Sequence, residues 1–184
     1  MLRLASALLV GTSLAACGAE PSVPTQRDPL AGLAVEQVLY ETEHIMTTGG
    51  VRKAILRADT AYFRPNDSEV DLRGVELEFF NEQTGVVSGK LTSATGEYDM
   101  STGAMTARGG AVLTLVEGAR RIESEELNYD LQADRVWSTL ATVMREGDRV
   151  VRGTSFESDT RFQNVTVQSA NVTGPAPTGG EVRF

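Results

Sequence analysis

A unit of strand, turn and strand recurs along this chain with a period of about thirty residues, and such a repeat is compatible with few folds. Three clear copies are EYDMSTGAM at 97–105, NYDLQADRV at 128–136 and ESDTRFQNV at 157–165. Each copy has an acidic residue near its start, then a polar turn, then an apolar residue at a fixed distance. Because a single hairpin cannot bury its own apolar face, these units must stack side by side.

Aligning the repeats, with a first copy around residue 63, gives columns of similar residues. The reference column contains Phe63, Tyr98, Tyr129 and Ser158. Seven positions earlier lies an apolar column of Leu56, Leu91, Ile122 and Val151. Five positions earlier lies a column of small residues, Ala58, Ser93, Ser124 and Gly153. Seven positions later lies a second apolar column, Val70, Met105, Val136 and Val165. The small column is expected to allow close packing.

An acidic residue follows the reference column in three of the four copies, as Asp99, Asp130 and Asp159, whereas the first copy has Arg64. Aspartate at the start of a turn usually accepts hydrogen bonds from the turn's own backbone. We therefore interpret these carboxylates as turn-forming groups and not as a catalytic set.

The fold class predicted from this pattern is all-β. Four hairpin units and an N-terminal strand give about nine long antiparallel strands in an elongated β-jellyroll or β-taco built from repeated hairpins. A two-sheet sandwich and a continuous solenoid-like taco both satisfy the pattern. Either arrangement has an elongated apolar interior and leaves its two end strands unpaired. Ten residues are expected to line the interior: Leu56, Leu72, Leu77, Phe79, Leu91, Met105, Leu113, Ile122, Val136 and Val151.

The N-terminal segment MLRLASALLVGTSLAAC has one positive charge, an apolar stretch and small residues before Cys17. That order is typical of a secretory signal peptide, and the apolar stretch is too short to span a membrane as a helix. We expect a signal peptide at 1–16, a tether at 17–34, a β domain at 35–172 and a disordered tail at 173–184.

The letters LAAC resemble the lipobox of bacterial lipoproteins, which implies that Cys17 is acylated and becomes the mature N-terminus. A lipid anchor also accounts for a single unpaired cysteine. With one cysteine and one histidine in the chain, a zinc site built from these residue types is excluded. We expect no metal and no cofactor.

The formal charge of −8 comes without a basic stripe, which argues against nucleic-acid binding. An enzyme is not expected either, and no catalytic residue is proposed. The single histidine, His44, lies in a strand-like segment, and the chain has neither a nucleophile-elbow motif nor a glycine-rich phosphate loop.

Two segments resemble the LptC family of lipopolysaccharide-export proteins and the wider OstA-like β-jellyroll group. They are AILRADTAYFRPNDSEVDLRGVELEFF at 54–80 and LTSATGEYDMSTGAMTARGGAVLTL at 91–115. The resemblance implies a periplasmic carrier that accepts lipopolysaccharide, through its lipid A acyl chains, from an inner-membrane ABC transporter. It also implies transfer to a periplasmic β-jellyroll bridge protein. A lipid anchor at the inner membrane is expected, although Gly18 after the cysteine leaves the outer membrane open.

The final strand is expected near RFQNVTVQSAN at 161–171, with Val165 and Val167 alternating with polar residues. No Lys or Pro protects this strand, so we expect a partner β domain to pair with it. A structural or scaffold lipoprotein, in which the ten interior residues form only a packed core, is the alternative. The space between the β layers distinguishes the carrier from the scaffold, since a packed core fills that space and a lipid trough is splayed open at one side or end.

Overall fold

The computed structural model describes residues 36–65, 67–116 and 119–174, and over these residues the regular structure is entirely β. The all-β prediction is thereby confirmed. Twelve antiparallel strands form one sheet: β1 Gln37–Thr48, β2 Val51–Phe63, β3 Glu69–Phe80, β4 Val87–Asp99, β5 Ala104–Leu115, β6 Arg120–Asp130, β7 Arg135–Ser138, β8 Thr142–Glu146, β9 Arg149–Gly153, β10 Ser155–Asp159, β11 Thr166–Gln168 and β12 Asn171–Thr173. The proposed signal peptide, Cys17, the tether and most of the C-terminal tail lie outside the described residues.

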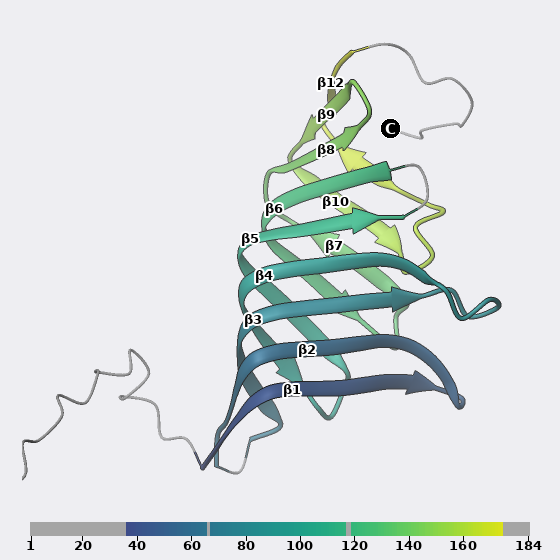
Figure 1. The fold of residues 1–184 in the computed structure, drawn as a ribbon. Helices are drawn as coiled ribbons and strands as arrows, with labels where there is room; N and C mark the ends of the chain where they lie inside the picture. Colours follow the sequence, from purple (N-terminus) through teal and green to yellow (C-terminus); the bar gives the residue numbers. More distant parts are fainter. Residues whose placement is uncertain (1–35, 66, 117–118, 175–184) are drawn as a thin grey trace, which may run out of the picture. The chain divides into compact units, whose positions relative to one another are not determined.

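Strands β1 to β6 are neighbours in space in the same order as in the sequence, as Figure 1 shows. Beyond β6 the sheet divides. One half of β6 pairs with β7, which continues to β10 and β11, and the other half pairs with β8, which continues to β9 and β12. Hairpins between sequence neighbours explain the order from β1 to β7, because each of these strands pairs with the next one along the chain, whereas β8 returns to pair with β6.

The six short strands are three long strands, each interrupted once. β7 and β8 are separated by residues 139–141, β9 and β10 by Thr154, and β11 and β12 by residues 169–170. Together with β1 to β6 they make up the expected count of about nine long strands. The count rises to twelve because each of the last three long strands is interrupted.

Every long strand bends near its middle, so the single sheet folds into two facing layers (Figure 1). We call the layer that contains β8, β9 and β12 layer 1 and the layer that contains β7, β10 and β11 layer 2. Strands β1 to β6 contribute one half to each layer. A single core cluster joins residues from both halves of the long strands, for example Leu56 and Ala61 of β2. Because all twelve strands of the described residues belong to one sheet, the continuous taco, and not two separate sheets, is the observed arrangement.

Residues with positive φ mark the line along which the sheet folds. Glu41, Gly74 and Ser169 have φ of 50°, 61° and 51°, and Gly109 and Gly110 both have 79°. The strand pairing shifts register between Thr92 and Thr95 and between Arg108 and Ala111, on the same line. Left-handed residues and bulges bend a strand locally, which explains why the fold occurs there.

The column of small residues found in the sequence lies beside this fold line. Ala58 and Ser124 are buried there, and Gly153 immediately precedes the break at Thr154. A Cβ on Gly153 would overlap Cγ1 of Val167 and lie 2.6 Å from the carbonyl oxygen of Gln168. The small residues thus permit the two halves of the sheet to approach each other at the bend.

We predict that Gly153→Ala lowers the free energy of unfolding by about 2 kcal/mol, since β11 must shift to admit the methyl group. Urea unfolding followed by circular dichroism measures the change. The control is Arg152→Ala in the same strand, whose side chain is exposed and whose effect should stay within about 0.5 kcal/mol. Equal stability of the two variants would contradict the close approach described here.

Candidate functional site: the apolar interior between the layers

The interior of layer 1 is a row of directly paired side chains that crosses the sheet from strand to strand. Leu56 pairs with Leu77, Leu77 with Leu91 and Leu91 with Leu113. The row continues through Ile122, Met144 and Val151. Neighbouring strands lie about 4.8 Å apart, so side chains at paired positions contact each other continuously.

Layer 2 carries a matching row that faces the first. Val70 pairs with Tyr98, Tyr98 with Met105, Met105 with Tyr129 and Tyr129 with Val136. The two apolar columns of the sequence repeat therefore belong to different layers. This division explains why they lie fourteen positions apart, on either side of the bend.

All ten residues expected to line the interior are buried in the core, none more than 4% exposed. Six of them form the row in layer 1: Leu56, Leu77, Leu91, Leu113, Ile122 and Val151. Phe79 lies beside that row, while Leu72, Met105 and Val136 belong to layer 2. The expected inward orientation is correct for every residue of the set, and contact with a lipid is a separate proposal.

Aromatic side chains join the two layers. Phe79 of layer 1 packs edge-on against Tyr129 of layer 2, with ring centroids 5.3 Å apart. At the β1 end, the Tyr98 hydroxyl lies 3.0 Å from Nε2 of His44, and their rings are 5.3 Å apart. The layers therefore meet through packed side chains at these contacts.

Phe162, in the segment between β10 and β11, adds a third contact that the sequence did not reveal. Its side chain is only 5% exposed and packs edge-on against Phe79 at 5.3 Å. The backbone of Phe162 has a φ of 58°, which is costly for a bulky residue. Gly89 gives it room, since a Cβ there would lie 2.9 Å from the Phe162 ring. A strand glycine of this kind often marks such a close approach.

Burial controls the ionisation of the two tyrosines in the interior. Removal from water raises the pKa of the Tyr129 hydroxyl, and the nearby Asp134 carboxylate raises it further. The pKa of Tyr98 is also raised, first by burial and then by Asp99. Both phenols therefore stay neutral at physiological pH, as a low-dielectric interior requires.

The acidic residues of the repeat have the predicted role in turns. Asp99 accepts hydrogen bonds from the backbone and hydroxyl of Ser101 and from the hydroxyl of Thr102, which together lower the pKa of its carboxyl. Asp130 accepts from the backbone of its turn in the same way, and so does Asp159. These carboxylates hold hairpin ends and lie outside the interior.

The expected final strand differs from the observed one. Instead of one strand near 161–171, the chain forms two strands of three residues, because it bends at Ser169. Val165 lies just before β11, and the Val167 side chain is 2% exposed and points into the core. A strand that docked here would meet the backbone of β11, and the Val167 side chain would not be part of the contact.

The first strand presents a longer edge. β1 pairs only with β2, and its other side has no partner strand among the described residues. Tyr40 is 74% exposed and Ile45 is 53% exposed. A long edge with exposed apolar side chains is suited to pairing with another β domain.

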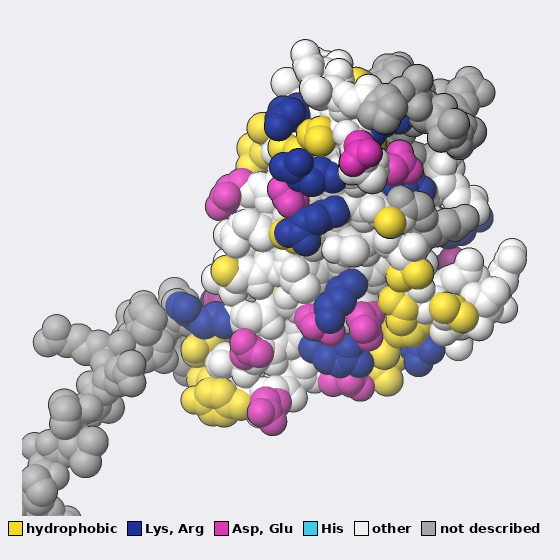
Figure 2. Space-filling view, turned by 45° about the horizontal axis from the view of Figure 1, so that its top comes forward, with side chains coloured by type: hydrophobic (Ala, Val, Ile, Leu, Met, Phe, Trp, Pro, Cys, Tyr) yellow, Lys and Arg dark blue, Asp and Glu magenta, His cyan; other side chains and the backbone are white. Residues whose placement is uncertain are grey.

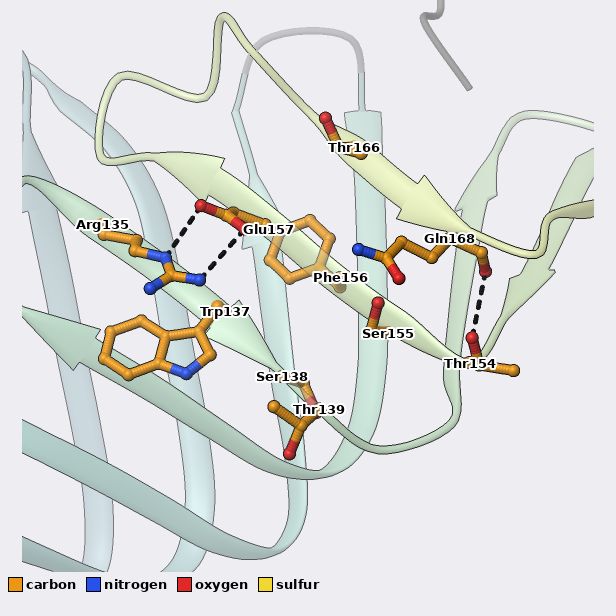
Figure 3. A pocket seen from close by; sticks show the side chains of 10 residues that line it. All are labelled: Arg135, Trp137, Ser138, Thr139, Thr154, Ser155, Phe156, Glu157, Thr166 and Gln168. Carbon is orange, nitrogen blue, oxygen red and sulfur yellow. Dashed lines mark hydrogen bonds and ion pairs between the residues drawn. The ribbon is translucent and has the colours of Figure 1, made fainter.

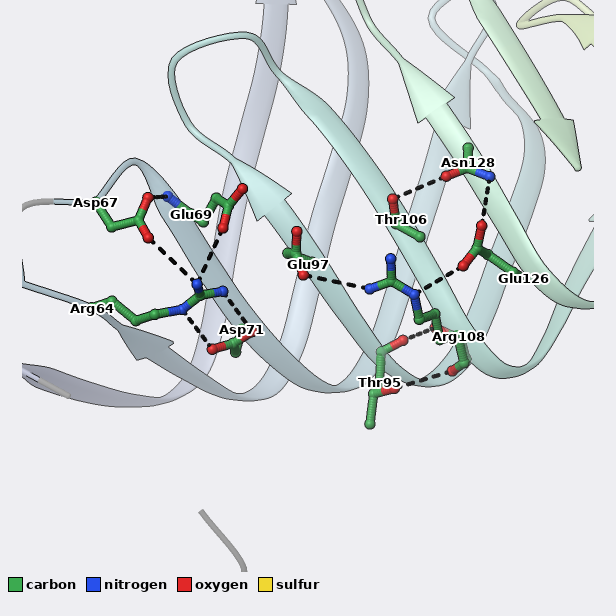
Figure 4. A network of polar contacts seen from close by, with 11 residues as sticks. Arg64, Asp67, Glu69, Asp71, Thr95, Glu97, Thr106, Arg108, Glu126 and Asn128 are labelled. Carbon is green, nitrogen blue, oxygen red and sulfur yellow. Dashed lines mark hydrogen bonds and ion pairs between the residues drawn. The ribbon is translucent and has the colours of Figure 1, made fainter. Parts of the chain in front are cut away.

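Ion pairs dominate the outer face over the early strands. Arg64 makes two hydrogen bonds of 3.0 Å with Asp71 and contacts Glu69 at 3.1 Å, and Arg108 bonds Glu126 at 2.9 Å (Figure 4). Figure 2 shows basic and acidic side chains interspersed on the face it presents. In each of these pairs the positive guanidinium lies beside a carboxylate, so the negative charge of that carboxylate is neutralised locally.

The described part of the chain was compared with two further kinds of site by its residues: metal centres and membrane-spanning helices. It contains no cluster of His, Cys, Asp or Glu suited to holding a metal ion. It also contains no helix of the length and hydropathy needed to cross a membrane.

A family model described as "LptC: Lipopolysaccharide-assembly, LptC-related" matches residues 32–174. Among solved structures, the chain is similar to LptH from Pseudomonas aeruginosa, described as the LptA-homologous periplasmic component of the lipopolysaccharide transport device. Sequence identity is 18%, the TM-score is 0.45, and the match covers 71% of this chain and 87% of that one. No curated protein sequence matches the chain.

We predict an alkaline loss of stability that originates in the interior. The unfolded Tyr129 phenol ionises near pH 10, whereas the folded one stays protonated to higher pH, so unfolding is favoured above pH 10. Tyr129→Phe should remove about 1 kcal/mol of the stability difference between pH 8 and pH 11, measured by urea unfolding. Tyr40→Phe, at an exposed position, is the control and should retain the full loss. An unchanged pH dependence in Tyr129→Phe would contradict this assignment.

Proposed function

Because the chain belongs to the LptC-related family of lipopolysaccharide-assembly proteins, we propose that it carries lipopolysaccharide with the acyl chains held between its two β layers. The family assigns the chain to lipopolysaccharide transport, which is not an enzymatic role. The observation that supports the carrier role is the uninterrupted apolar row in layer 1. It runs from Leu56 of β2 to Val151 of β9, and at β1 the residue paired with Leu56 is the exposed His44.

The energetics favour a continuous row over separate pockets. Each exposed CH₂ of an acyl chain costs about 0.8 kcal/mol in water, so a chain should move only along surface that stays apolar. Successive strands bring a new apolar side chain into the row at every step of about 4.8 Å. An acyl chain can then slide from one strand to the next without returning to water.

Entry of an acyl chain requires the layers to separate, because the interior residues are nearly fully buried. The cross-layer contacts Phe79–Tyr129, Phe79–Phe162 and His44–Tyr98 are the ones that would be replaced. The strained backbone at Phe162 would be relieved when its ring leaves the interior, which lowers the cost of opening. The fold line, with its left-handed residues, supplies the hinge.

The two ends of the sheet suit different partners. We assign the β1 edge to the β domain of an inner-membrane ABC transporter, since it is the longer edge and exposes Tyr40 and Ile45. The edge at β11, next to Val165 and Val167, is assigned to a periplasmic β-jellyroll bridge protein. Strand pairing at both ends would bring the apolar interiors of the neighbouring proteins next to each other.

A scaffold protein is the second candidate, and the closed packing of the interior favours it. In that role the rows of layers 1 and 2 only hold the fold together, and no lipid enters. Inner and outer side chains alternate along each strand, so two neighbouring residues face opposite sides of the sheet. A carrier should contact lipid through the inner residue and not the outer one, whereas a scaffold should contact lipid through neither.

A photoreactive phenylalanine at two adjacent positions separates these functions. Phe79 points into the interior, whereas Phe80 lies on the outer face. The Arg52 guanidinium lies over the Phe80 ring, 3.9 Å from its centroid. In cells that make lipopolysaccharide, we predict that the probe at position 79 cross-links to lipopolysaccharide and the probe at position 80 does not. The products are detected by immunoblot with antibody to lipopolysaccharide.

Circular dichroism of both probe-bearing proteins confirms that they are folded. The absence of lipid cross-links at position 79 in a folded protein would leave the scaffold function standing. The same probe at Tyr40, on the β1 edge, should cross-link to protein instead of lipid. A purely lipid product there would refute the assignment of β1 to a partner domain.

We further propose that Cys17 carries the lipid anchor and places the domain on the periplasmic side of the inner membrane. Two or more acyl chains are needed for stable anchoring, which lipoprotein processing would supply. Cys17→Ala should abolish metabolic labelling with a clickable fatty acid and release the domain from the membrane fraction. Since Cys17 is the only cysteine, labelling that persists in this variant would refute the proposal.

A further inference from the structure

A groove of about 360 Å³ lies on the outer face of layer 2, over β7, β10 and β11. Figure 3 shows Trp137 and Gln168 on opposite sides of Ser155. The three residues come from three neighbouring strands, with β10 in the middle. Outward residues of β10 alternate with buried Phe156, so the short Ser155 side chain forms the floor and the longer neighbours form the walls.

One wall of the groove combines an aromatic surface with a fixed charge pair. Trp137 is the only tryptophan of the chain, and the Arg135 guanidinium lies over its ring, 4.6 Å from the centroid. Arg135 is in turn held by Glu157, with N–O distances of 2.8 and 3.0 Å. The indole is therefore fixed in place and partly buried, and neighbouring charges orient it.

The rest of the lining consists of short polar groups that both donate and accept hydrogen bonds. Hydroxyls come from Ser155, Thr166, Thr139 and Thr154, and a carboxamide comes from Gln168. The backbone N–H of Thr154 donates to the carbonyl of Gln168 at 3.0 Å, which fixes the far wall. Such a mixture of neutral polar groups beside one aromatic ring suits a ligand with many hydroxyls and an apolar ring face.

We propose that this groove binds a saccharide, namely the sugar portion of the lipopolysaccharide whose acyl chains occupy the interior. The inference rests on the proposed function and adds a second contact to it, on the opposite face of the sheet. The C–H groups of a sugar ring would pack against the part of the Trp137 indole that Arg135 does not cover, and its hydroxyls would bond Gln168, Ser155 and Glu157. The groove lies at the β11 end, where the cargo would leave.

The lining argues against other ligands. An acyl chain would find hydroxyls and charges where it needs an apolar surface. A free phosphate would need an unpaired cation, but the Arg135 guanidinium already bonds Glu157. A neutral polyol satisfies the hydroxyls and carboxamide without breaking that pair.

The single tryptophan provides a direct measurement on the full-length chain. The probe is the oligosaccharide released by complete deacylation of lipopolysaccharide, which retains its sugars and phosphates but has no acyl chains. We expect a saturable change in Trp137 emission at concentrations up to about 1 mM, as suits a few hydrogen bonds and one stacked ring. Inorganic phosphate alone should give no response. A response to phosphate, or silence with the oligosaccharide, would overturn the saccharide site.

A substitution that fills the groove tests the same proposal, with a matched control elsewhere on the outer face. Ser155→Leu places a larger side chain on the floor of the groove, at an outward position that does not enter the core. It should weaken oligosaccharide binding about tenfold or more. The control Thr92→Leu makes the same kind of change at a partly buried, outward position of β4 and should bind normally. Wild-type affinity in a folded Ser155→Leu protein would also overturn the proposal.

Failure of this site and failure of the carrier function give different results. If whole lipopolysaccharide cross-links at position 79 while the oligosaccharide leaves Trp137 unchanged, only the saccharide site is refuted. If the oligosaccharide binds while position 79 gives no lipid cross-link, the interior route is refuted and the outer groove stands.

Discussion

Cross-strand register determines where every side chain of this domain lies. In an antiparallel sheet, a shift by one residue would exchange the inner and outer faces of a whole strand. The repeat opposes such a shift because three of its turns begin at an equivalent aspartate, held by hydrogen bonds such as those from Ser101 to Asp99. Leu56, Leu91, Ile122 and Val151 therefore fall into one row although they lie far apart in the sequence.

The bend in each strand lets the inward side chains of the two layers face each other. A flat sheet of nine long strands would expose one apolar face to water, whereas folding each strand in half lets the sheet cover itself. The cost is concentrated on one line, at Glu41, Gly74, Gly109, Gly110 and Ser169, where the backbone is left-handed. Small residues beside that line, such as Gly153, let the layers meet without a gap. The same line is the natural hinge if the layers separate.

The sequence predicts the inward set well because burial follows the period of two residues and the repeat confirms it at several offsets. The sequence does not predict which halves of the strands face each other. The contact between Phe79 and Tyr129, for example, joins the two layers and forms only because the strands bend. Phe162 was missed because it lies in a turn-like segment, outside the repeat columns. The groove around Trp137 was missed because its residues meet only when β10 lies between β7 and β11.

An amphipathic cargo imposes two demands that one sheet can meet on its two faces. The inner face excludes water and offers an unbroken apolar row, so it suits chains that slide without a fixed position. The outer face at the β11 end has a fixed indole and oriented hydrogen-bonding groups, so it suits a ring that binds in one orientation. Weak binding on the outer face would then hold the cargo in register at the exit without preventing its transfer, since release requires only a few hydrogen bonds to break.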